Sequence, residues 1–383
     1  MKLINRDYIN EKDKKLVELF ISPTPMKKYV LGINKLTKSV LKHIEVDGVI
    51  DDFTRVQRSR KKEIFKIEDV EKDALILWTA TGSPLEVKRR LDEMGFKNIS
   101  YLALCKYSAF DLVESPFIMD FEEDYKQNRD SYEEVYNLLA DKKSQDIFTK
   151  VLNFKISFDY EFMEGFTNDH EGQYFDKELL PPISKIKFFD GGAYVGDTAE
   201  EVIKNYPDFK KLWLIEPIPE NIRIAKRELS GFDGIEFLTC GVSNKKQTLY
   251  FNEEKSFSSI YGKGTQSVEV DTIDNIINEE VDFIKLDIEG AEQDAIEGAK
   301  ETIKMYKPIL AICIYHKAED WYKIPQKVLE IEPDYDVYLR HYMEGIFETV
   351  MYFIPKSHTL NKVVKQTKGL NQVQTTSQKQ QIS

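Results

Sequence analysis

Short apolar runs recur through the second half of the chain, and acidic or small residues follow several of them directly. Continuous apolar runs bounded by turn residues are typical of strands buried on both faces, whereas apolar residues three and four apart predict helices. The runs predict seven strands, at residues 186–189, 211–216, 235–238, 281–286, 309–314, 334–342 and 349–354. Helices are predicted between them, as at residues 220–229. This alternation indicates an α/β domain with a mostly parallel sheet.

The first third of the chain shows a second set of the same alternation. Strands are predicted at residues 27–33, 46–50, 74–79 and 99–104, and helices at residues 8–20, 36–44 and 84–94. We therefore predict a small Rossmann-like α/β domain over residues 1–120. Its first turn has one glycine, Gly32, where a dinucleotide-binding turn has three, so close approach of a pyrophosphate is disfavoured. We expect this degenerate domain to be structural or to bind a partner.

The region that follows is rich in acidic and aromatic residues. Residues 121–180 are predicted to form a helical connector whose aromatic rings pack mainly in the core. A second interpretation places residues 158–174, with Asp169 and His170, in a substrate cleft or lid. The end of the chain, residues 357–383, is predicted to be a disordered polar tail, because its last residues lack the apolar side chains needed for packing.

The turn after the strand at residues 186–189 is the main candidate for ligand binding. It reads Asp190-x-Gly192-x-x-x-Gly196-Asp197, with an acid on each side of the glycines. Glycine lets the backbone turn with positive φ and approach a ligand closely. Two carboxylates would repel a pyrophosphate, but they suit a cationic ligand with an ammonium group and hydroxyls, and S-adenosylmethionine has both. The other interpretation is an ordinary structural turn, because glycine turns after strands are common.

An acid at the end of the next strand favours the ligand-binding interpretation. Glu216 follows roughly twenty residues later, where a carboxylate that binds ribose hydroxyls is expected. The alternative for Glu216 is a solvated charge at a strand end. The following residues are predicted to form the cofactor site: Asp190, Gly191, Gly192, Ala193, Gly196, Asp197, Thr198, Glu216, Pro217, Gly241, Val242 and Asp287.

Five segments of this half resemble the FkbM-type methyltransferases: FFDGGAYVGDT, LWLIEPIPENI, VEVDTIDNII, VDFIKLDIEGAEQDAIEGAKETI and KPILAICIYHK. The resemblance covers residues 186–355 and keeps the order and spacing of the motifs. It implies a seven-stranded Rossmann-like class I methyltransferase domain, predicted at residues 181–356, that uses S-adenosyl-L-methionine. It also implies an O-methyltransferase acting on a hydroxyl of a sugar, nucleotide sugar or glycan, in envelope polysaccharide or secondary-metabolite biosynthesis.

Strand ends also deliver the candidate catalytic groups. Asp287 and Glu289 follow the fourth predicted strand, and His316 follows the fifth. A neutral imidazole at His316 could take the proton of the acceptor hydroxyl, or it could be a hydrogen-bonded wall residue. Alternatively, these three residues could hold a divalent metal, magnesium or manganese, that polarises the hydroxyl. Glu289 could instead cap the helix that begins near Ala291. Strand alternation places Lys285 on the opposite side of its strand from Leu286, and we expect it to pair with a carboxylate.

Composition and charge limit the partners. With 54 basic and 66 acidic residues the net charge is −12, which disfavours nucleic-acid binding because phosphate contact needs a basic surface. Three cysteines without zinc-site spacing fit a reducing compartment, so we expect a cytoplasmic protein. No apolar run is long enough to span a membrane, so no membrane insertion is expected.

Two functions from different classes stay open. The first is the O-methyltransferase, with a small-molecule or glycan substrate. The second is a catalytically inactive methyltransferase-fold binding module that recruits other biosynthetic enzymes through its first domain. The partner of that domain could instead be a second copy of the chain, in a homo-oligomer. Intact acids at Asp190, Glu216 and Asp287 favour the enzyme.

Overall fold

The structure, a computed structural model, describes residues 1–358 except for residues 2, 5–7, 55–57, 60–61 and 252–265. Within this part the chain forms two compact units, each assembled from separate segments. The first unit comprises Met1–Arg129, Asp146–Asp169 and His341–Phe347, and the second comprises Asp130–Gln145, His170–Arg340 and the residues from Glu348 on. The predicted domain limits at residues 120, 180 and 356 stay predictions, and the predicted tail lies outside the described residues from residue 359 on.

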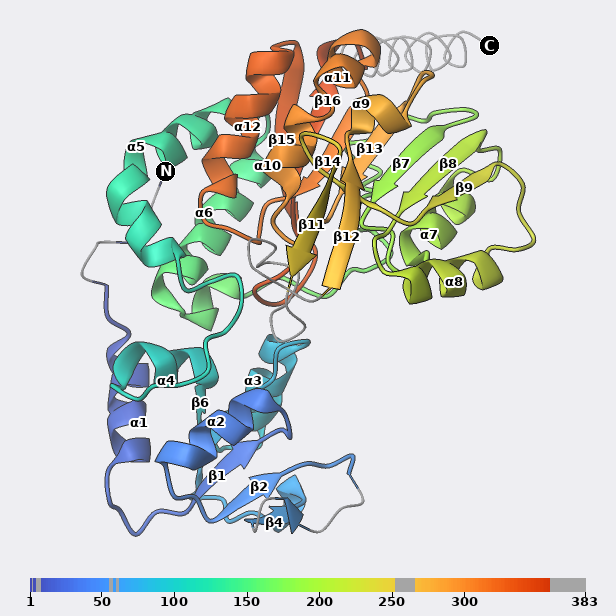
Figure 1. Ribbon diagram of the computed structural model, residues 1–383. Helices are drawn as coiled ribbons and strands as arrows, with labels where there is room; N and C mark the ends of the chain where they lie inside the picture. The colour runs from blue at the N-terminus through green and yellow to red at the C-terminus, as the bar shows by residue number, and fades with distance from the viewer. Residues whose placement is uncertain (2, 5–7, 55–57, 60–61, 252–265, 359–383) are drawn as a thin grey trace, which may run out of the picture. The chain divides into compact units, whose positions relative to one another are not determined.

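The second unit is built on a seven-stranded sheet with the strand order β15-β16-β14-β13-β7-β8-β9 (Figure 1). The five strands from β14 to β9 in this order are parallel, and β16 runs antiparallel to β14. This confirms the predicted α/β fold with a mostly parallel sheet. The strands are β7 (Lys187–Gly191), β8 (Lys211–Ile215), β9 (Ile235–Leu238), β13 (Phe283–Leu286), β14 (Ile309–Cys313), β15 (Tyr335–His341) and β16 (Thr349–Pro355).

The central strands of this sheet are buried along their whole length, in β7, β13, β14 and β16 alike. Strands covered on both faces read as continuous apolar runs, which is why the sequence reveals them. Phe188 on β7 and Phe283 on β13 lie opposite each other and stack with ring centroids 4.9 Å apart. This aromatic contact joins the two strands in the core.

Helices alternate with the strands of this sheet. Helix α7 begins directly after Gly196, which adopts a left-handed φ of +92°. Helix α8 has Pro219 in its first turn, where the missing N–H group costs nothing. The helices are α7 (Asp197–Asn205), α8 (Pro219–Glu228), α9 (Ile273–Ile276), α10 (Glu292–Glu297), α11 (Lys300–Tyr306) and α12 (Asp320–Ile331).

A three-stranded sheet in the same unit was not predicted. It has the order β10-β12-β11 and consists of β10 (Gly241–Val242), β11 (Gln247–Phe251) and β12 (Gln266–Asp271). Strand β11 pairs antiparallel with β12, so that Leu249 lies opposite Val268. These strands mix polar and apolar residues instead of forming an apolar run, so a search for continuous runs does not find them.

Segments far apart in the sequence complete the second unit. Arg340 on β15 forms ion pairs with Asp141 (2.8 Å) and Asp176 (2.7 Å). The backbone N–H of Ala140 donates to the carbonyl oxygen of Val337 (2.8 Å). Asp141 and Arg340 are 199 residues apart, so this corner of the unit forms only when both segments are present.

Two long helices, α5 (Phe121–Leu138) and α6 (Lys142–Ser157), lie within the predicted connector. The division between the two units falls inside both helices. Helix α5 is kinked at Asn128, whose φ of −120° and ψ of 26° are not helical. The kink lies next to Arg129, where the first segment of the first unit ends.

The first unit contains a six-stranded sheet with the order β3-β4-β2-β1-β5-β6. All of its strands are parallel except β3, which is antiparallel to β4. This confirms the predicted small Rossmann-like α/β arrangement. Its elements are α1 (Glu11–Ile21), β1 (Lys28–Leu31), α2 (Lys35–His43), β2 (Gly48–Ile50), β3 (Arg58–Ser59), β4 (Lys62–Phe65), η1 (Ile67–Asp69), β5 (Leu75–Trp78), α3 (Pro84–Glu93), β6 (Lys97–Ser100), α4 (Tyr101–Tyr107) and η2 (Tyr160–Met163).

The predicted strand at residues 99–104 is wrong beyond its second residue. Strand β6 ends at Ser100, whose hydroxyl oxygen accepts a hydrogen bond from the N–H of Ala103 (2.9 Å) and caps helix α4. The apolar residues that follow are therefore buried in a helix. A short apolar run does not distinguish a buried helix from a strand, and the capping serine was the signal for the change.

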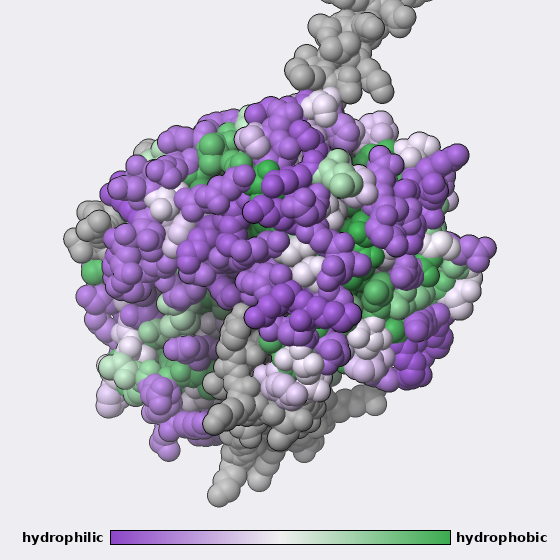
Figure 2. All heavy atoms as spheres, turned by 45° about the horizontal axis from the view of Figure 1, so that its top comes forward, coloured by the Kyte–Doolittle hydropathy of each residue, from purple (hydrophilic) through white to green (hydrophobic). Residues whose placement is uncertain are grey.

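No helix among the described residues is long and apolar enough to cross a membrane. Figure 2 shows hydrophilic residues over most of one face of the molecule, with smaller groups of apolar residues between them. Scattered exposed apolar residues are normal for a globular protein.

Side chains of the first unit fill the point where its strand order reverses. The chain continues from β1 to β2 on one side of β1 and later returns to β5 on the other side. Open α/β sheets commonly bind ligands in the crevice where the strand order reverses in this way. There Asn34 donates to the carbonyl oxygen of Thr79 (2.9 Å), and the hydroxyl groups of Thr37 and Thr79 lie 3.0 Å apart. The polar groups that would face a phosphate are thus bonded to each other.

We therefore expect the first unit not to bind NAD or NADP in the micromolar range. Isothermal titration calorimetry of the full chain with each dinucleotide checks this, with excess S-adenosylmethionine present so that the second unit does not contribute. Micromolar binding that Asn34→Ala and Thr79→Ala weaken would contradict this interpretation.

Candidate functional site

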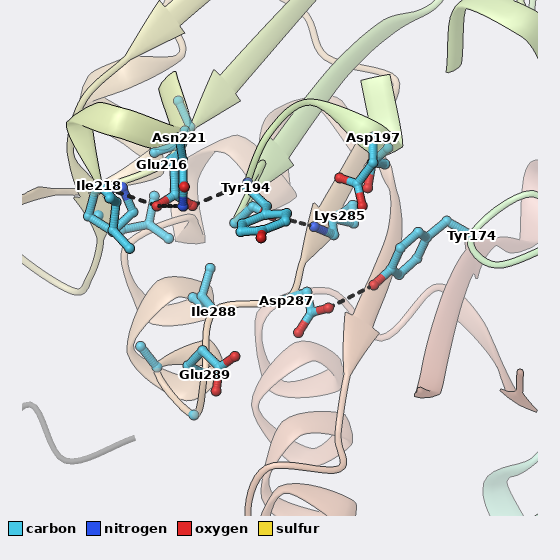
Figure 3. Close-up of a pocket in the computed structure, with 18 of the residues that line it drawn as sticks. Tyr174, Tyr194, Asp197, Glu216, Ile218, Asn221, Lys285, Asp287, Ile288 and Glu289 are labelled. Atoms are coloured by element: carbon cyan, nitrogen blue, oxygen red, sulfur yellow. Dashed lines mark hydrogen bonds between the residues drawn. The ribbon is translucent and has the colours of Figure 1, made fainter. Parts of the chain in front are cut away.

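A cavity of about 960 Å³ lies at the carboxyl ends of β7, β8 and β13 in the second unit (Figure 3). Strands β7 and β13 are neighbours, and the chain continues from β7 to β8 on one side and from β13 to β14 on the other. Open α/β sheets bind ligands at this reversal of strand order. The volume is near the upper end of the roughly 300–1,000 Å³ typical of ligand pockets. The cavity therefore has room for a cofactor and for part of a second molecule.

The glycine turn after β7 fits tightly against the loop after β13. Gly192 has a φ of +83°, and a Cβ atom at this position would lie 1.9 Å from the carbonyl oxygen of Asp287, so a larger residue does not fit. The N–H groups of Gly192 and Ala193 both donate to the carbonyl oxygen of Ile215 at the end of β8 (3.0 Å each). The turn is thereby held against both neighbouring strands.

The predicted residues of this turn fall into two groups. Gly192, Asp197 and Thr198 line the cavity. Gly191, Ala193 and Gly196 are buried and shape the turn without lining the cavity. The second group affects a ligand only through the backbone that it positions.

Asp190 and Lys285 form a buried ion pair between β7 and β13. Their side chains are 0 % and 3 % exposed, and Nζ lies 3.0 Å from Oδ1. The Lys285 ammonium group also donates to the carbonyl oxygen of Gly192 (2.8 Å). Burial lowers the pKa of Lys285, but the carboxylates of Asp190 and Asp287 outweigh this effect and raise the pKa, so the ammonium group stays charged. Lys285 lines the cavity, and Asp190 acts on the cavity by holding Lys285.

Glu216 is a fixed carboxylate at the end of β8. It is 6 % exposed and lines the cavity. One oxygen accepts hydrogen bonds from the N–H of Ile218 (2.9 Å) and from the side chain of Asn221 (3.2 Å), and the other accepts from the N–H of Tyr194 (3.2 Å). Burial raises the pKa of Glu216, and these hydrogen bonds act against that shift. Figure 3 shows Tyr194, Ile218 and Asn221 gathered around Glu216.

The three-stranded sheet supplies an apolar wall of the cavity. The predicted residues Gly241 and Val242 line it from β10, and Pro217 lines it after β8. Leu249, Val268 and Val270 line it from β11 and β12, which the sequence did not predict as strands. One side of the cavity is thus apolar, while the carboxylates lie elsewhere on its wall.

Asp287 is held by two tyrosines. One carboxylate oxygen accepts a hydrogen bond from the hydroxyl of Tyr174 (3.1 Å; Figure 3), and the other accepts one from the hydroxyl of Tyr315 (3.1 Å). Burial alone would raise the pKa of Asp287, but the charges of Lys285 and His316 and the tyrosine hydrogen bonds outweigh it and lower the pKa. Asp287 is therefore an ionised, oriented group.

The structure brings the three predicted catalytic residues together. The Nε2 atom of His316 lies 3.4 Å from Asp287 Oδ1 and 4.0 Å from Glu289 Oε2, and its Nδ1 atom lies 3.0 Å from Glu292 Oε1. Burial lowers the pKa of His316, but these three carboxylates outweigh burial and raise it to about 9. At neutral pH His316 is an imidazolium, and its neighbours Tyr315 and Lys317 line the cavity in its place.

Glu292, and not Glu289, holds the loop that leads into α10. One Glu292 oxygen accepts hydrogen bonds from the N–H groups of Ile288 (2.9 Å) and Gly290 (3.4 Å). Glu289 has a left-handed φ of +57°, and its side chain lines the cavity. The expected capping role of Glu289 is therefore wrong, because no side chain caps the start of α10 and the next acid along the chain, Glu292, holds the loop before it.

The side chains of Asp287, Glu292 and His316 lie close enough to share a metal ion, with ligand atoms within 4.8 Å of one another. A hard dication such as magnesium takes an octahedron of oxygen ligands. Here both Asp287 oxygens already accept tyrosine hydrogen bonds, and the protonated imidazole of His316 has no lone pair for a metal. These groups fit magnesium or manganese poorly, and the metal suggested for Asp287, Glu289 and His316 stays a prediction.

The second interpretation of residues 158–174 placed them in a substrate cleft, and two of these residues, His170 and Tyr174, line the cavity. Sequence reasoning missed that Tyr174 is a partner of Asp287, and it missed Glu348 altogether. Glu348 lines the cavity from the residue before β16, and burial together with the charge of Asp287 raises the pKa of Glu348 to about 7. A signal existed for Glu348, because the start of an antiparallel strand lies at the edge where parallel strands end.

Removing the charge of Lys285 should destabilise the second unit. Lys285→Met leaves Asp190 buried without its partner, and breaking a buried pair from one side costs about 3–5 kcal/mol. Thermal melting of the full chain should show a clear loss, and the double variant Asp190→Asn/Lys285→Met should recover part of it. Equal melting temperatures for Lys285→Met and the parent protein would contradict a structural role for the pair.

Comparisons with known proteins agree with this geometry. A family model described as the methyltransferase FkbM domain matches residues 190–342. The crystal structure of Methyltransferase FkbM from Methylobacillus flagellatus KT is similar in fold, with a TM-score of 0.72 and 22 % identity, covering 90 % of this chain and 94 % of that chain. No curated protein matched the sequence.

Other solved structures are similar over about half of the chain. An rRNA methylase from Streptococcus thermophilus has a TM-score of 0.31 and 12 % identity, covering 45 % of this chain and 88 % of that chain. Fibrillarin from Aeropyrum pernix, solved with natively bound S-adenosyl-L-methionine, has a TM-score of 0.30 and 12 % identity, covering 46 % of this chain and 69 % of that chain. The family match begins within β7 and extends past β15, so it contains the strands whose ends form most of the cavity. We conclude that residues 190–342 form a methyltransferase domain that matches the FkbM model, and that the protein is a methyltransferase.

Proposed function

We propose that the protein transfers the methyl group of S-adenosyl-L-methionine to a hydroxyl oxygen of an uncharged sugar or glycan. The observation that carries the proposal is Glu216, a buried carboxylate held at the cavity by two backbone N–H groups and Asn221. A fixed carboxylate at the end of the second parallel strand suits the ribose hydroxyls of an adenosine-containing cofactor. Three hydrogen bonds leave about one of the four acceptor positions of the carboxylate for a ribose hydroxyl.

The remaining walls also fit this cofactor. Its sulfonium and ammonium groups are cationic, and Asp197, Glu200 and Glu201 line the cavity from α7. Val242 and Ile218 give the cavity apolar surface beside Glu216, which suits an adenine ring. The positive charge of the cofactor thus faces acids, while its base faces apolar side chains.

The charge of the cavity favours an uncharged acceptor. Its described lining contains two lysines, Lys285 and Lys317, and Lys285 is already paired with Asp190. Phosphate groups would meet repulsion here, so a neutral sugar or glycan fits better than a nucleotide sugar, although both were predicted from the resemblance. The lining carboxylates belong to ten residues: Glu171, Asp197, Glu200, Glu201, Glu216, Asp287, Glu289, Asp294, Glu319 and Glu348.

The cofactor supplies a methyl group activated by the sulfonium, and the protein must hold the acceptor oxygen in line with it. Asp287, oriented by Tyr174 and Tyr315, is a hydrogen-bond acceptor for the incoming hydroxyl. His316 stabilises the charge of Asp287 in its imidazolium form. As the predicted base, His316 is poorly suited, because the neighbouring carboxylates raise its pKa and favour the form that already holds the proton.

Three further expectations remain predictions. They are the cytoplasmic location, a partner or second copy bound through the first unit, and the inactive binding module as the alternative function. The oriented carboxylates of Glu216 and Asp287 speak against the inactive module, because a recruiting module does not need them.

Loss of Glu216 should weaken the cofactor specifically. Glu216→Ala removes a charged hydrogen-bond partner, which costs about 1.5–3 kcal/mol, so the Kd for S-adenosylmethionine should rise roughly 10- to 150-fold. Titration calorimetry measures this change. The matched control is Glu220→Ala, an exposed acid in the first turn of α8. Equal affinities in the two folded variants would remove Glu216 from the cofactor site.

Neutral acceptors should be methylated in preference to phosphorylated ones. The assay incubates the full chain with S-adenosylmethionine and either neutral methyl glycosides and glycan fragments or nucleotide sugars, and mass spectrometry detects the added methyl group. Methylation confined to nucleotide sugars would contradict the charge argument. A parallel reaction with a chelator tests the metal, and loss of turnover that magnesium or manganese restores would show a metal requirement.

A further inference from the structure

Glu348 reaches the cavity from a strand that the predicted site did not include. It directly precedes β16, which is antiparallel to β14, with Val350 opposite Cys313. The start of β16 therefore lies at the edge where the parallel strands end. The side chain of Glu348 lines the same cavity as Asp287 and Lys285.

The backbone and a neighbouring amide fix the side chain of Glu348. Its φ of +62° lies in the left-handed region, which residues other than glycine rarely adopt. The side-chain amide of Gln173 donates to one Glu348 oxygen and also donates to the hydroxyl of Tyr174 (3.0 Å). Unfavourable backbone conformations that persist at the wall of a cavity are concentrated at functional sites.

Glu348 belongs to the group of side chains around Asp287. One ligand atom from each of Asp287, Cys313 and Glu348 lies within 4.8 Å of the others. The hydroxyl of Tyr174 contacts both Asp287 (3.1 Å) and the sulfur of Cys313 (3.3 Å). A hydroxyl that binds to Asp287 would therefore lie next to Glu348.

The other candidate bases are less suited to receive a proton. Both oxygens of Asp287 accept tyrosine hydrogen bonds, and His316 faces Glu292 with one ring nitrogen and Asp287 with the other. The side chain of Glu289 is 46 % exposed, so water competes for it. Glu348 combines a place on the cavity wall with a half-buried side chain that Gln173 holds in place.

We infer that Glu348 takes the proton from the acceptor hydroxyl during methyl transfer. The inference rests on the proposed function, because it requires a sulfonium methyl donor and a hydroxyl acceptor. In this step the acceptor oxygen bonds to the methyl carbon while the carbon–sulfur bond breaks and its electron pair passes to sulfur. The sulfonium becomes a neutral thioether, the acceptor becomes a neutral ether, and the hydroxyl proton passes to the carboxylate of Glu348. Release of that proton to water restores the carboxylate.

The test compares Glu348→Gln and Glu348→Asp in the full chain. Glutamine keeps the size and the backbone preference of the side chain but accepts no proton, whereas aspartate keeps the carboxylate on a shorter stem. The control is Glu301→Gln, which removes an exposed carboxylate on α11. The probes are S-adenosylmethionine with a labelled methyl group and a panel of neutral methyl glycosides. Calorimetry gives the Kd for S-adenosylmethionine, initial rates give kcat and KM, and thermal melting checks folding.

We expect Glu348→Gln to lower kcat by about 10²–10⁴-fold, the usual range for loss of a general base, with the cofactor Kd unchanged. Glu348→Asp should retain part of kcat, and Glu301→Gln should match the parent protein. A kcat for Glu348→Gln close to that of the parent would overturn the inference. So would a parallel loss of cofactor affinity and melting temperature, because that pattern indicates a structural role. A parent protein that binds S-adenosylmethionine but methylates no glycoside would overturn the proposed acceptor, and the inference with it.

Discussion

The ion pair of Asp190 with Lys285 lies where the two central strands of the sheet meet the cavity. The two residues are direct cross-strand neighbours on β7 and β13, so their contact is fixed by the register of the sheet. A buried charge is tolerated only when neighbouring groups compensate it. Besides Asp190, Lys285 also donates a hydrogen bond to the carbonyl oxygen of Gly192. Gly192 in turn touches the backbone of Asp287. The glycine turn after β7 and the loop after β13 are therefore held together by these contacts.

Charges of opposite sign alternate beyond this pair. The imidazolium of His316 lies between Glu292 and Asp287, and it keeps two buried carboxylates from facing each other without a cation. Burial and the nearby charge of Asp287 raise the pKa of Glu348, and they outweigh the charges of Lys285 and His316, which lower it. Burial and neighbouring charges thus divide the carboxylates of one cavity into ionised acceptors and a weaker acid.

The sequence was most informative where strands end. Asp190, Glu216 and Asp287 each follow an apolar run, and the structure places all three at or beside one cavity because parallel strands end at the same edge. Alternation along β13 also predicted that Lys285 pairs with an acid. Groups that depend on tertiary packing could not be predicted in this way. Tyr174 reaches Asp287 across 113 residues of sequence, and the fold alone determines that approach.

Other misses have local causes. The run at residues 101–104 is as apolar as a strand, and only the capping hydroxyl of Ser100 makes it a helix. The three-stranded sheet forms from mixed polar and apolar residues, so no continuous run marks it. Glu292 was overlooked because Glu289, three residues earlier, has an equally suitable side chain, and the left-handed turn between them decides which acid faces the backbone N–H groups.

The segment around Asp141 has a consequence for how the protein is made. Asp141 leaves the ribosome 199 residues before Arg340, its partner in the folded second unit. The pairing of Ala140 with Val337 must wait for the same late segment. Contacts this distant in sequence form slowly because a long loop must close first. Residues 130–145 therefore cannot form these contacts until most of the second unit has been synthesised. A chain truncated before β15 would lack Val337 and Arg340, the residues that hold this segment in place.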